Sequence, residues 1–477
     1  MKKYTAPYEN SKLWLIPVVL PLLLIIFSYA LTEWSWGLMD DLTLLSVPGS
    51  VWDRTKIIFQ LYFNFGEMKW THALHCAVFY KVFSASPKAF HFFKFSEIAV
   101  TLGIWGLLAW RLTGRSVALL LFSAIALTFH YLYDQFFFLS THETTGLLFL
   151  GLGLYAIAVV EIEPKDVGRR ICGWLVAVAA LVASLGAKEP FLTGILSAGI
   201  SLFWLGCNTK DRRGLVWMGV GCAIAALGYG VYLKVGVSKA YTAGYSLMDI
   251  SRMAANLIVW AKKIFLNHVP WIVVCGGVLG LTGGFPKWRD LSLGERFGLV
   301  LAAALYCSFL GVFLPWAVTS YYVGPLGLFF ALAVSVLLAR RIELLDGKRS
   351  LALILFATVF TGFMAFYTLN RESTYHYDTQ NLWAWMKGNG DFQEKEKKEQ
   401  VFCNAMEGSV AIPGHANRWW GLGLKNFAWE SGGISKALGR GARYYVFSKR
   451  FGELDQTDLK GWRTVFYSKF WQVYQKE

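Results

Sequence analysis

The chain has 477 residues, of which 55% are hydrophobic and 16% charged, and its formal net charge is +15. Soluble globular chains carry closer to a quarter charged residues, so the composition excludes an ordinary water-soluble enzyme and indicates an integral membrane protein. The positive charge gathers in short loops beside apolar segments, which favours a topology signal and contact with anionic lipid over nucleic-acid binding. The seven cysteines include no CxxC pair and indicate neither a zinc site nor a disulfide framework.

Eleven apolar runs predict eleven transmembrane helices, because a spanning helix needs roughly 20 apolar residues. In chain order the runs cover 13–32, 95–112, 116–133, 143–161, 171–187, 190–207, 215–234, 266–285, 297–316, 321–339 and 351–368. The first run follows Lys2 and Lys3, as a signal peptide would. Its apolar stretch is too long for one and ends without small residues, so we interpret it as a retained anchor.

Basic residues between alternate runs predict the orientation. They are Arg111 and Arg115; Lys165, Arg169 and Arg170; Lys210, Arg212 and Arg213; Lys287, Arg289 and Arg296; and Arg340, Arg341, Lys348 and Arg349. All five groups fall on the side of the N-terminus. The positive-inside rule therefore predicts a cytoplasmic N-terminus and an extracytoplasmic C-terminus. The N-terminal prefix and the short cytoplasmic loops favour a bacterial inner membrane, with the C-terminus in the periplasm, and a protein of the endoplasmic reticulum is the alternative.

The opposite side receives a long first loop, 33–94, and a C-terminal region, 371–477. Segments 53–65 and 69–83 of the loop mix aromatic, aliphatic and basic residues, as helices in the lipid headgroup layer do, and 246–264 shows a similar amphipathic face. The C-terminal region has strand-like runs at 408–412, 443–448 and 464–468. We expect an all-α membrane domain over 1–370 and a small α/β extracytoplasmic domain over 371–477.

Asp40 and Asp41 stand just beyond the first apolar run, and His142-Glu143 opens the fourth run from the same side. Adjacent carboxylates raise one another's pKa, which suits a general base or a cation site. A solvated loop or helix cap is the alternative for the aspartates. A favourable partner of the helix dipole is the alternative for Glu143.

Lys188-Glu189-Pro190 lies where the fifth run turns back into the sixth almost without a loop. Ionisable groups at membrane depth generally line a cavity or meet a ligand, and a lysine there could bind a lipid phosphate. An internal pair of Lys188 with Glu189 or an aspartate is the alternative. Arg371, with His376 behind it, follows the last run and is either a further anion-binding candidate or a solvated junction.

This arrangement resembles the GT-C glycosyltransferases, and within them the group of protein O-mannosyltransferases and lipid A aminoarabinose transferases. The resemblance rests on the layout of 1–370, on the acidic motif MDDL at 39–42 and on the segment LVASLGAKEPFLTGILS at 181–197. It departs from the group at AVTSYYVGPLG, residues 317–327, where the group often has an arginine.

The resemblance implies transfer of a sugar from a polyprenyl-phosphate donor to a lipid, glycan or protein acceptor on the outer face, by single displacement with inversion. Asp40 or Asp41 would then deprotonate the acceptor hydroxyl, and Lys188 would contact the donor phosphate. The full set of expected site residues adds Arg54, Lys81 and Arg371 as phosphate-binding candidates and His142, Glu143, Glu189, Tyr321 and Tyr322 as lining of a substrate pocket.

We predict no cofactor and no metal; a magnesium or manganese ion, if one is used, would be held by Asp40, Asp41 and Glu143. The expected partners are the lipid-linked donor, the acceptor and membrane lipids, with the chain acting as a monomer. Three alternatives stay open on sequence alone: a flippase or exporter of lipid-linked glycans, a glycan polymerase or ligase, and a non-enzymatic assembly subunit. The transport alternative is disfavoured because no internal repeat is evident.

Overall fold

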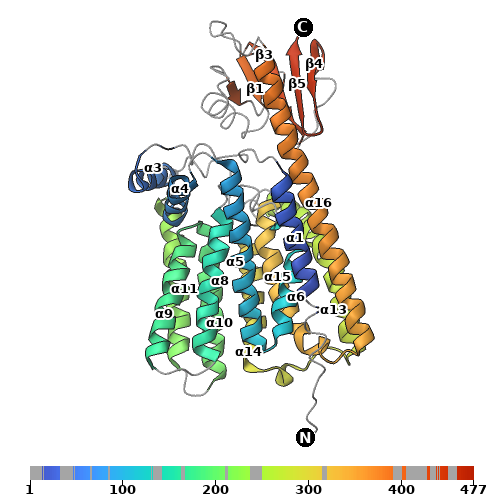
Figure 1. Ribbon diagram of the computed structural model, residues 1–477. Helices are drawn as coiled ribbons and strands as arrows, with labels where there is room; N and C mark the ends of the chain where they lie inside the picture. Colours follow the sequence, from blue (N-terminus) through green and yellow to red (C-terminus); the bar gives the residue numbers. More distant parts are fainter. Residues whose placement is uncertain are drawn as a thin grey trace.

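A computed structural model gives the fold of the chain as a helical bundle that carries a small β-sheet at one end (Figure 1). The structure describes residues 15–32, 49–64, 67–83, 86–129, 131–132, 142–162, 167–209, 213–236, 250–313, 320–389, 400–403, 427–429, 441–449 and 459–477, together with Leu13, Val47, Ile434, Ala437 and Gly439.

The bundle confirms all eleven predicted segments as helices. They are α1 (Ile16–Leu31), α5 (Pro87–Thr113), α6 (Ser116–Ala126), α8 (His142–Ile162), α9 (Val167–Leu185), α10 (Leu192–Asn208), α11 (Arg213–Gly236), α13 (Ile250–Leu281), α14 (Leu293–Phe313), α15 (Ser320–Ile342) and α16 (Gly347–Gly388). Among the described residues, seven helices are long and apolar enough to span a membrane, and α1, α6, α10 and α11 contribute shorter apolar stretches. The chain is therefore an integral membrane protein.

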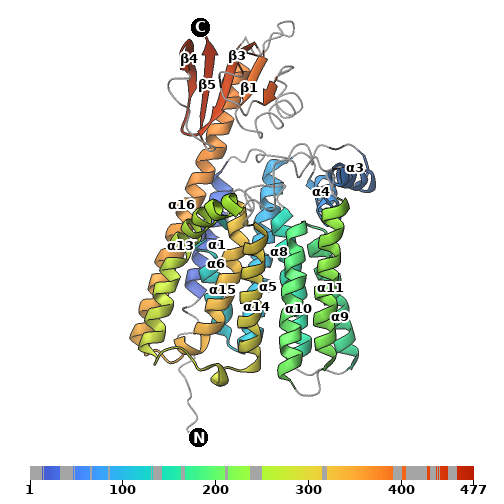
Figure 2. The same cartoon turned by 180° about the vertical axis from the view of Figure 1, so that it is seen from behind.

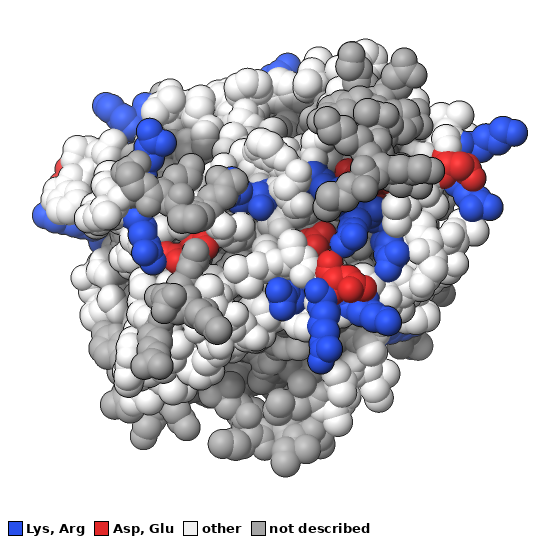
Figure 3. All heavy atoms as spheres, turned by 90° about the horizontal axis from the view of Figure 1, so that it is seen from below, with Lys and Arg blue, Asp and Glu red and all other residues white. Residues whose placement is uncertain are grey.

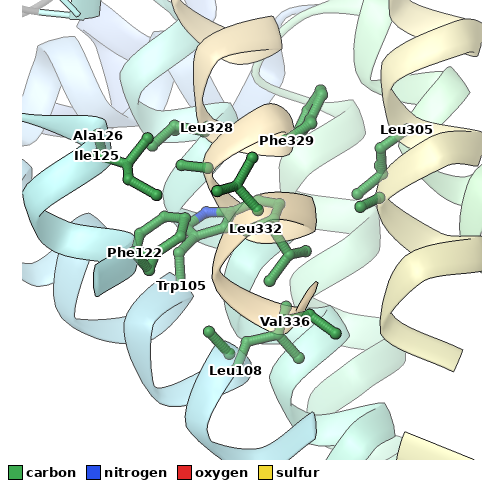
Figure 4. Packing of buried hydrophobic residues seen from close by; sticks show 14 of the residues in the cluster. Trp105, Leu108, Phe122, Ile125, Ala126, Leu305, Leu328, Phe329, Leu332 and Val336 are labelled. Carbon is green, nitrogen blue, oxygen red and sulfur yellow. The ribbon is translucent and has the colours of Figure 1, made fainter. Parts of the chain in front are cut away.

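The middle of the bundle is a dry core around α15. Trp105 of α5, Phe122 of α6 and Leu305 of α14 are fully buried against Phe329 and Leu332 of α15 (Figure 4). Lipid tails are as apolar as these side chains, so close packing rather than water exclusion holds such helices together. The contact of α10 with α11 illustrates this, since a Cβ added at Gly199 would lie 2.9 Å from the carbonyl oxygen of Gly219.

Local sequence signals set the helix ends. Ser86 caps α5 by accepting a hydrogen bond from the Ala89 N–H, Pro87 occupies the first turn, and Gly114 ends the helix with φ +70°. At the start of α16, Asp346 accepts a hydrogen bond from the Arg349 N–H at 2.8 Å. These caps keep the short connections of the bundle compact.

The C-terminal sheet stands at one end of the bundle, and the turns from α5 to α6 and from α15 to α16 lie at the opposite end (Figures 1 and 2). The end opposite the sheet gathers lysine and arginine side chains, with fewer acidic ones among them (Figure 3). Several are anchored there: Arg115 pairs with Glu343, Arg170 lies 3.1 Å from Glu161, and Arg341 donates to the Thr282 carbonyl oxygen. We call this the inner end, and the end that carries the sheet the outer end.

At the outer end the first loop forms two helices, α3 (Val51–Asn64) and α4 (Trp70–Phe83), as predicted (Figure 1). The amphipathic segment 246–264 is not a separate helix, because its described part continues into the eighth span as α13. The first part of α13 lies across the outer end before the helix turns down beside α16 (Figure 2).

The C-terminal sheet has five strands in the order β2-β1-β3-β5-β4. The strands are β1 (Gln400–Cys403), β2 (Phe427–Trp429), β3 (Ala442–Ser448), β4 (Trp462–Tyr467) and β5 (Trp471–Lys476). Strand β1 pairs in parallel with β2 and β3, whereas β5 is antiparallel to β3 and β4. The runs at 443–448 and 464–468 are thus confirmed as strands, and 408–412 lies outside the described residues.

Helix α16 carries the sheet. It has 42 residues, about 63 Å at 1.5 Å per residue, which is roughly twice the thickness of a bilayer's hydrocarbon core. It runs without interruption through the expected domain boundary at residue 370. Near its end, Asp378 accepts a hydrogen bond from the Phe470 N–H at 2.9 Å, and Thr379 accepts one from the Trp471 indole at 3.1 Å. The sheet is therefore docked on the helix.

Candidate functional site

Helix α4 is seated on the turn that joins α9 to α10. The backbone N–H groups of Thr71 and His72 both point to the carbonyl oxygen of Gly186, at 2.9 and 3.4 Å. A Cβ at Gly186 would come within 2.3 Å of the Trp70 indole, so only glycine permits this approach. One face of α4 is thereby held against the outer ends of the spans.

Lys188, directly after that turn, forms an ion pair with Glu143 at the start of α8. The Lys188 side chain is 11% exposed and the Glu143 side chain only 2%, so the pair is largely removed from water. Two residues from different predicted hairpins are thus brought together. The alternative expected from sequence, a pair of Lys188 with Glu189 or an aspartate, stays a prediction, because the Glu189 side chain, Asp40 and Asp41 lie outside the described residues.

A second pair lies beside the first. Lys94 of α5 donates to Thr144 Oγ1 at 2.8 Å and lies 3.1 Å from Glu97, one turn further along the same helix. Glu97 also accepts a hydrogen bond from Thr145 at 3.0 Å and lies 3.7 Å from Nε2 of His75. Helices α4, α5 and α8 therefore meet at one buried carboxylate.

Histidines fill the space between these pairs. The His72 ring contacts the His142 ring edge-to-face, with centroids 4.4 Å apart, and Cys76 Sγ lies 3.4 Å from His72 Nε2. Burial, reinforced by His75 and nearby lysines, lowers the pKa of His72 well below its usual value, and burial together with Lys94 does the same for His75. Both imidazoles are consequently neutral at pH 7.

Lys69 completes the arrangement from the start of α4. Its Nζ lies 2.6 Å from Glu67 and 4.4 Å from the centre of the Tyr62 ring. We call the whole set the outer polar cluster: Glu67, Lys69, His72, His75, Cys76, Lys94, Glu97, His142, Glu143, Thr144, Thr145 and Lys188. Three lysines, each paired with a carboxylate, here surround a group of neutral histidines, an arrangement suited to receiving an anionic headgroup.

The other predicted phosphate-binding residues lie elsewhere. Arg54 donates to the Gly49 carbonyl oxygen and stacks 3.9 Å from the centre of the Tyr80 ring. Lys81 lies on the exposed face of α4, opposite His72. Arg371 pairs with Glu372 at 2.7 Å on α16. The outer polar cluster thus takes in Lys188 but not these three side chains.

Asp40 and Asp41 lie outside the described residues, and so do the side chains of Glu189, Tyr321 and Tyr322. Their assignments stay predictions. Glu143, the third expected ligand for magnesium or manganese, is already paired with Lys188. A hard divalent cation would therefore have to compete with a lysine for that carboxylate.

Sequence reasoning overlooked Lys94, Glu97, His72 and His75 as site residues. A signal was present for the first two, because a lysine and a glutamate three residues apart at the mouth of an apolar helix are costly unless paired. The histidines, at i and i+3 on a loop helix, gave no comparable signal until the packing of α4 was known.

No protein-family model matches the sequence, and no curated protein matches it significantly. Solved structures do match. ArnT from Cupriavidus metallidurans aligns over 96% of this chain and 97% of its own, at 12% identity with a TM-score of 0.54 in the apo state, and at 11% identity with a TM-score of 0.50 when bound to undecaprenyl phosphate. The archaeal oligosaccharyltransferase AglB from Archaeoglobus fulgidus aligns over 99% of this chain and 75% of its own at 12% identity, with a TM-score of 0.46.

The alignment with ArnT runs through both the helical bundle and the C-terminal sheet, since it covers nearly the whole of both chains. At 11–12% identity it establishes architecture. The resemblance expected from the acidic and lysine motifs is confirmed at that level: the chain has the GT-C fold of ArnT, the lipid A aminoarabinose transferase.

Proposed function

We propose that this protein transfers a sugar from a polyprenyl-phosphate donor to an acceptor at the outer end of the bundle, by single displacement with inversion. The observation that carries the proposal is the outer polar cluster, in which Lys69, Lys94 and Lys188 surround His72 in a chain with the fold of ArnT. One of the ArnT structures was obtained with undecaprenyl phosphate bound, a ligand of the proposed donor class.

The chemistry requires a base and a fixed cation. The acceptor oxygen attacks C1 of the sugar and loses its proton to Asp40 or Asp41, while the bond from C1 to the phosphate oxygen breaks. The lipid phosphate leaves with the bonding electrons and gains negative charge. A buried cation such as Lys188 stabilises that charge most as it develops in the transition state.

The three ion pairs prepare the cluster for this role. Without donor, each of the three lysines has a carboxylate beside it, that of Glu143, Glu97 or Glu67, which offsets the cost of burying its charge. A phosphate entering beside Lys188 competes with Glu143 for the same ammonium group. The lysine side chains are thus already fixed and buried in the folded protein, so binding of the donor does not have to supply the free energy of ordering them.

We place the outer end in the periplasm of a bacterial inner membrane, because the basic loops gather at the opposite end (Figure 3). The lipid tail of the donor would stay in the bilayer while its sugar head reacts at the outer boundary. The acceptor is a lipid, a glycan or a protein, and the chain works as a monomer.

The test uses purified full-length protein in lipid nanodiscs with radiolabelled polyprenyl-phosphate sugars and candidate acceptors. We expect Asp40→Asn or Asp41→Asn to reduce transfer roughly 100- to 10,000-fold. Asp53→Asn is the matched control, because Asp53 belongs to the same loop and its carboxylate accepts hydrogen bonds from Ser50 at the start of α3. Full activity in both the Asp40 and the Asp41 variant would refute the assignment of the base, and no transfer with any donor would refute the proposed function.

A further inference from the structure

Helix α4 carries three soft metal-ligand side chains on its buried face. His72, His75 and Cys76 occupy positions i, i+3 and i+4, which lie on one side of a helix. One ligand atom from each falls within 4.8 Å of the other two. His72 and Cys76 are 0% and 2% exposed, so the donor atoms face protein rather than solvent.

The distances approach those around a bound zinc ion. With Zn–S near 2.3 Å and Zn–N near 2.0 Å, tetrahedral geometry places sulfur and nitrogen ligands about 3.5 Å apart. Cys76 Sγ lies 3.4 Å from His72 Nε2. The pair therefore already has the spacing of two ligands on one metal, and a nitrogen of His75 lies within 4.8 Å of both ligand atoms.

Neighbouring groups orient the third ligand. Nε2 of His75 faces Glu97 at 3.7 Å and Thr145 Oγ1 at 3.4 Å, which leaves Nδ1 for a metal. A ligating histidine commonly turns its other nitrogen to a carboxylate, which fixes the tautomer and makes the imidazole more basic. Glu97 is itself held by Lys94, so this outer contact is well defined.

The charge balance selects the kind of ion. A neutral imidazole offers a lone pair to a metal, and a Cys76 thiolate would offset half the charge of a divalent ion. The nearby lysines oppose a hard, weakly held cation, and no carboxylate is among the three ligands. Imidazole and thiolate donors suit zinc.

We propose that His72, His75 and Cys76 form a zinc-binding site that fixes α4 against α5 and α8. The next nitrogen within reach is His142, whose ring contacts His72 and whose buried Nδ1 has no hydrogen-bond partner among the described residues. Three protein ligands and one exchangeable position would otherwise complete a tetrahedron. The site does not depend on the proposed sugar transfer.

The test is metal binding by the full chain in nanodiscs, without any substrate. Chelator-treated protein is titrated with Zn²⁺ and, separately, with Co²⁺, and bound metal is measured by elemental analysis. We expect about one tightly bound ion per chain and, with Co²⁺, a near-ultraviolet thiolate-to-cobalt charge-transfer band. Cys76→Ser should abolish the band, whereas Cys207→Ser, at an exposed position of α10, should leave it unchanged.

A second variant distinguishes the loss of a metal ligand from misfolding, the other possible cause of a missing band in Cys76→Ser. It keeps Cys76 and replaces the other six cysteines by serine, and it should still give the band. Absence of the band from the wild type, its persistence in Cys76→Ser or its loss from the variant that keeps only Cys76 would overturn the proposal. Because no donor or acceptor is used, such a failure is distinct from failure of sugar transfer.

Discussion

The pair of Lys188 and Glu143 offers the sharpest test of how the outer end is built. Glu143→Gln removes the carboxylate that is paired with the largely buried Lys188, and Lys188→Met removes the ammonium group that is paired with the buried Glu143. The double variant removes both charges. Each single variant should therefore be less stable than the wild type, and the double variant should be more stable than the sum of the two losses predicts.

The magnitude follows from burial. At an effective dielectric constant of about 20, two unit charges about 4 Å apart attract by ~4 kcal/mol. Removing one partner of a buried pair costs about 3–5 kcal/mol, because the remaining charge is desolvated without compensation. We expect each single substitution to cost about 3 kcal/mol and the coupling free energy to reach about 2–3 kcal/mol.

Equilibrium unfolding in mixed micelles measures this double-mutant cycle. The same cycle on Asp346 and Arg349 is the control, because their side chains are 56% and 54% exposed and such pairs contribute less than about 1 kcal/mol. A coupling below about 0.5 kcal/mol between Lys188 and Glu143 would refute the reasoning. It would mean that the two charges are not paired in a dry environment.

Three further outcomes follow from the described contacts. Gly186→Ala should lower the free energy of unfolding by about 1–3 kcal/mol and increase hydrogen exchange in α4, because the new methyl group collides with the Trp70 indole. Unchanged exchange would contradict the packing of α4 against the turn between α9 and α10. The free energy of unfolding should fall as the pH drops below 6.5, because His72 and His75 take up protons there in the unfolded chain, whereas burial lowers their pKa in the folded chain. The free energy of unfolding, measured against pH, should fall less steeply in the His72→Gln/His75→Gln variant than in the wild type. Thr379→Val should lower the free energy of unfolding by about 1–3 kcal/mol, because the buried Trp471 indole loses its hydrogen-bond acceptor. Protection of β5 from hydrogen exchange should also fall, and unchanged protection would show that this hydrogen bond does not hold the sheet on α16.

The positions of the spans were predictable because the length and hydropathy of an apolar run can be read from that segment alone. The residues at which the long helices begin and end could not be predicted in this way. Segment 246–264 was expected to be separate from the span after it, yet α13 passes through the polar Asn267 and His268. Both side chains bond carbonyl oxygens one turn back, those of Lys263 and Ile264, at 2.6 and 2.7 Å. The helix backbone thus accepts a hydrogen bond from each of these two side chains, and a polar dipeptide did not mark its end.

The site was predictable only in part, because its partners are distant in sequence. Position at the outer end singled out Glu143 and Lys188 separately, but their pairing across 45 residues depends on how α8 meets the turn before α10. Lys94 was the last residue of the predicted outer loop, and Glu97 lay in the first turn of the span predicted to begin at 95. Cysteine spacing argued against zinc because it tests pairs of cysteines, whereas His72, His75 and Cys76 become candidates only once one face of α4 is known to be buried.

The placement of charge also bears on the transport alternative. A flippase or exporter needs a polar route through mid-membrane, usually at broken helices. Among the described residues, buried acidic and lysine side chains lie at the outer cluster, at the α16–sheet junction or at the inner end, where Glu161 meets Arg170 and Glu295 caps the start of α14. Between them stands the dry core of Trp105, Phe329 and Leu332, all fully buried (Figure 4). Moving a sugar headgroup through that core would mean separating α5 from α15, whereas chemistry at the outer boundary leaves the core intact, and this asymmetry favours an enzyme that works at one face of the membrane.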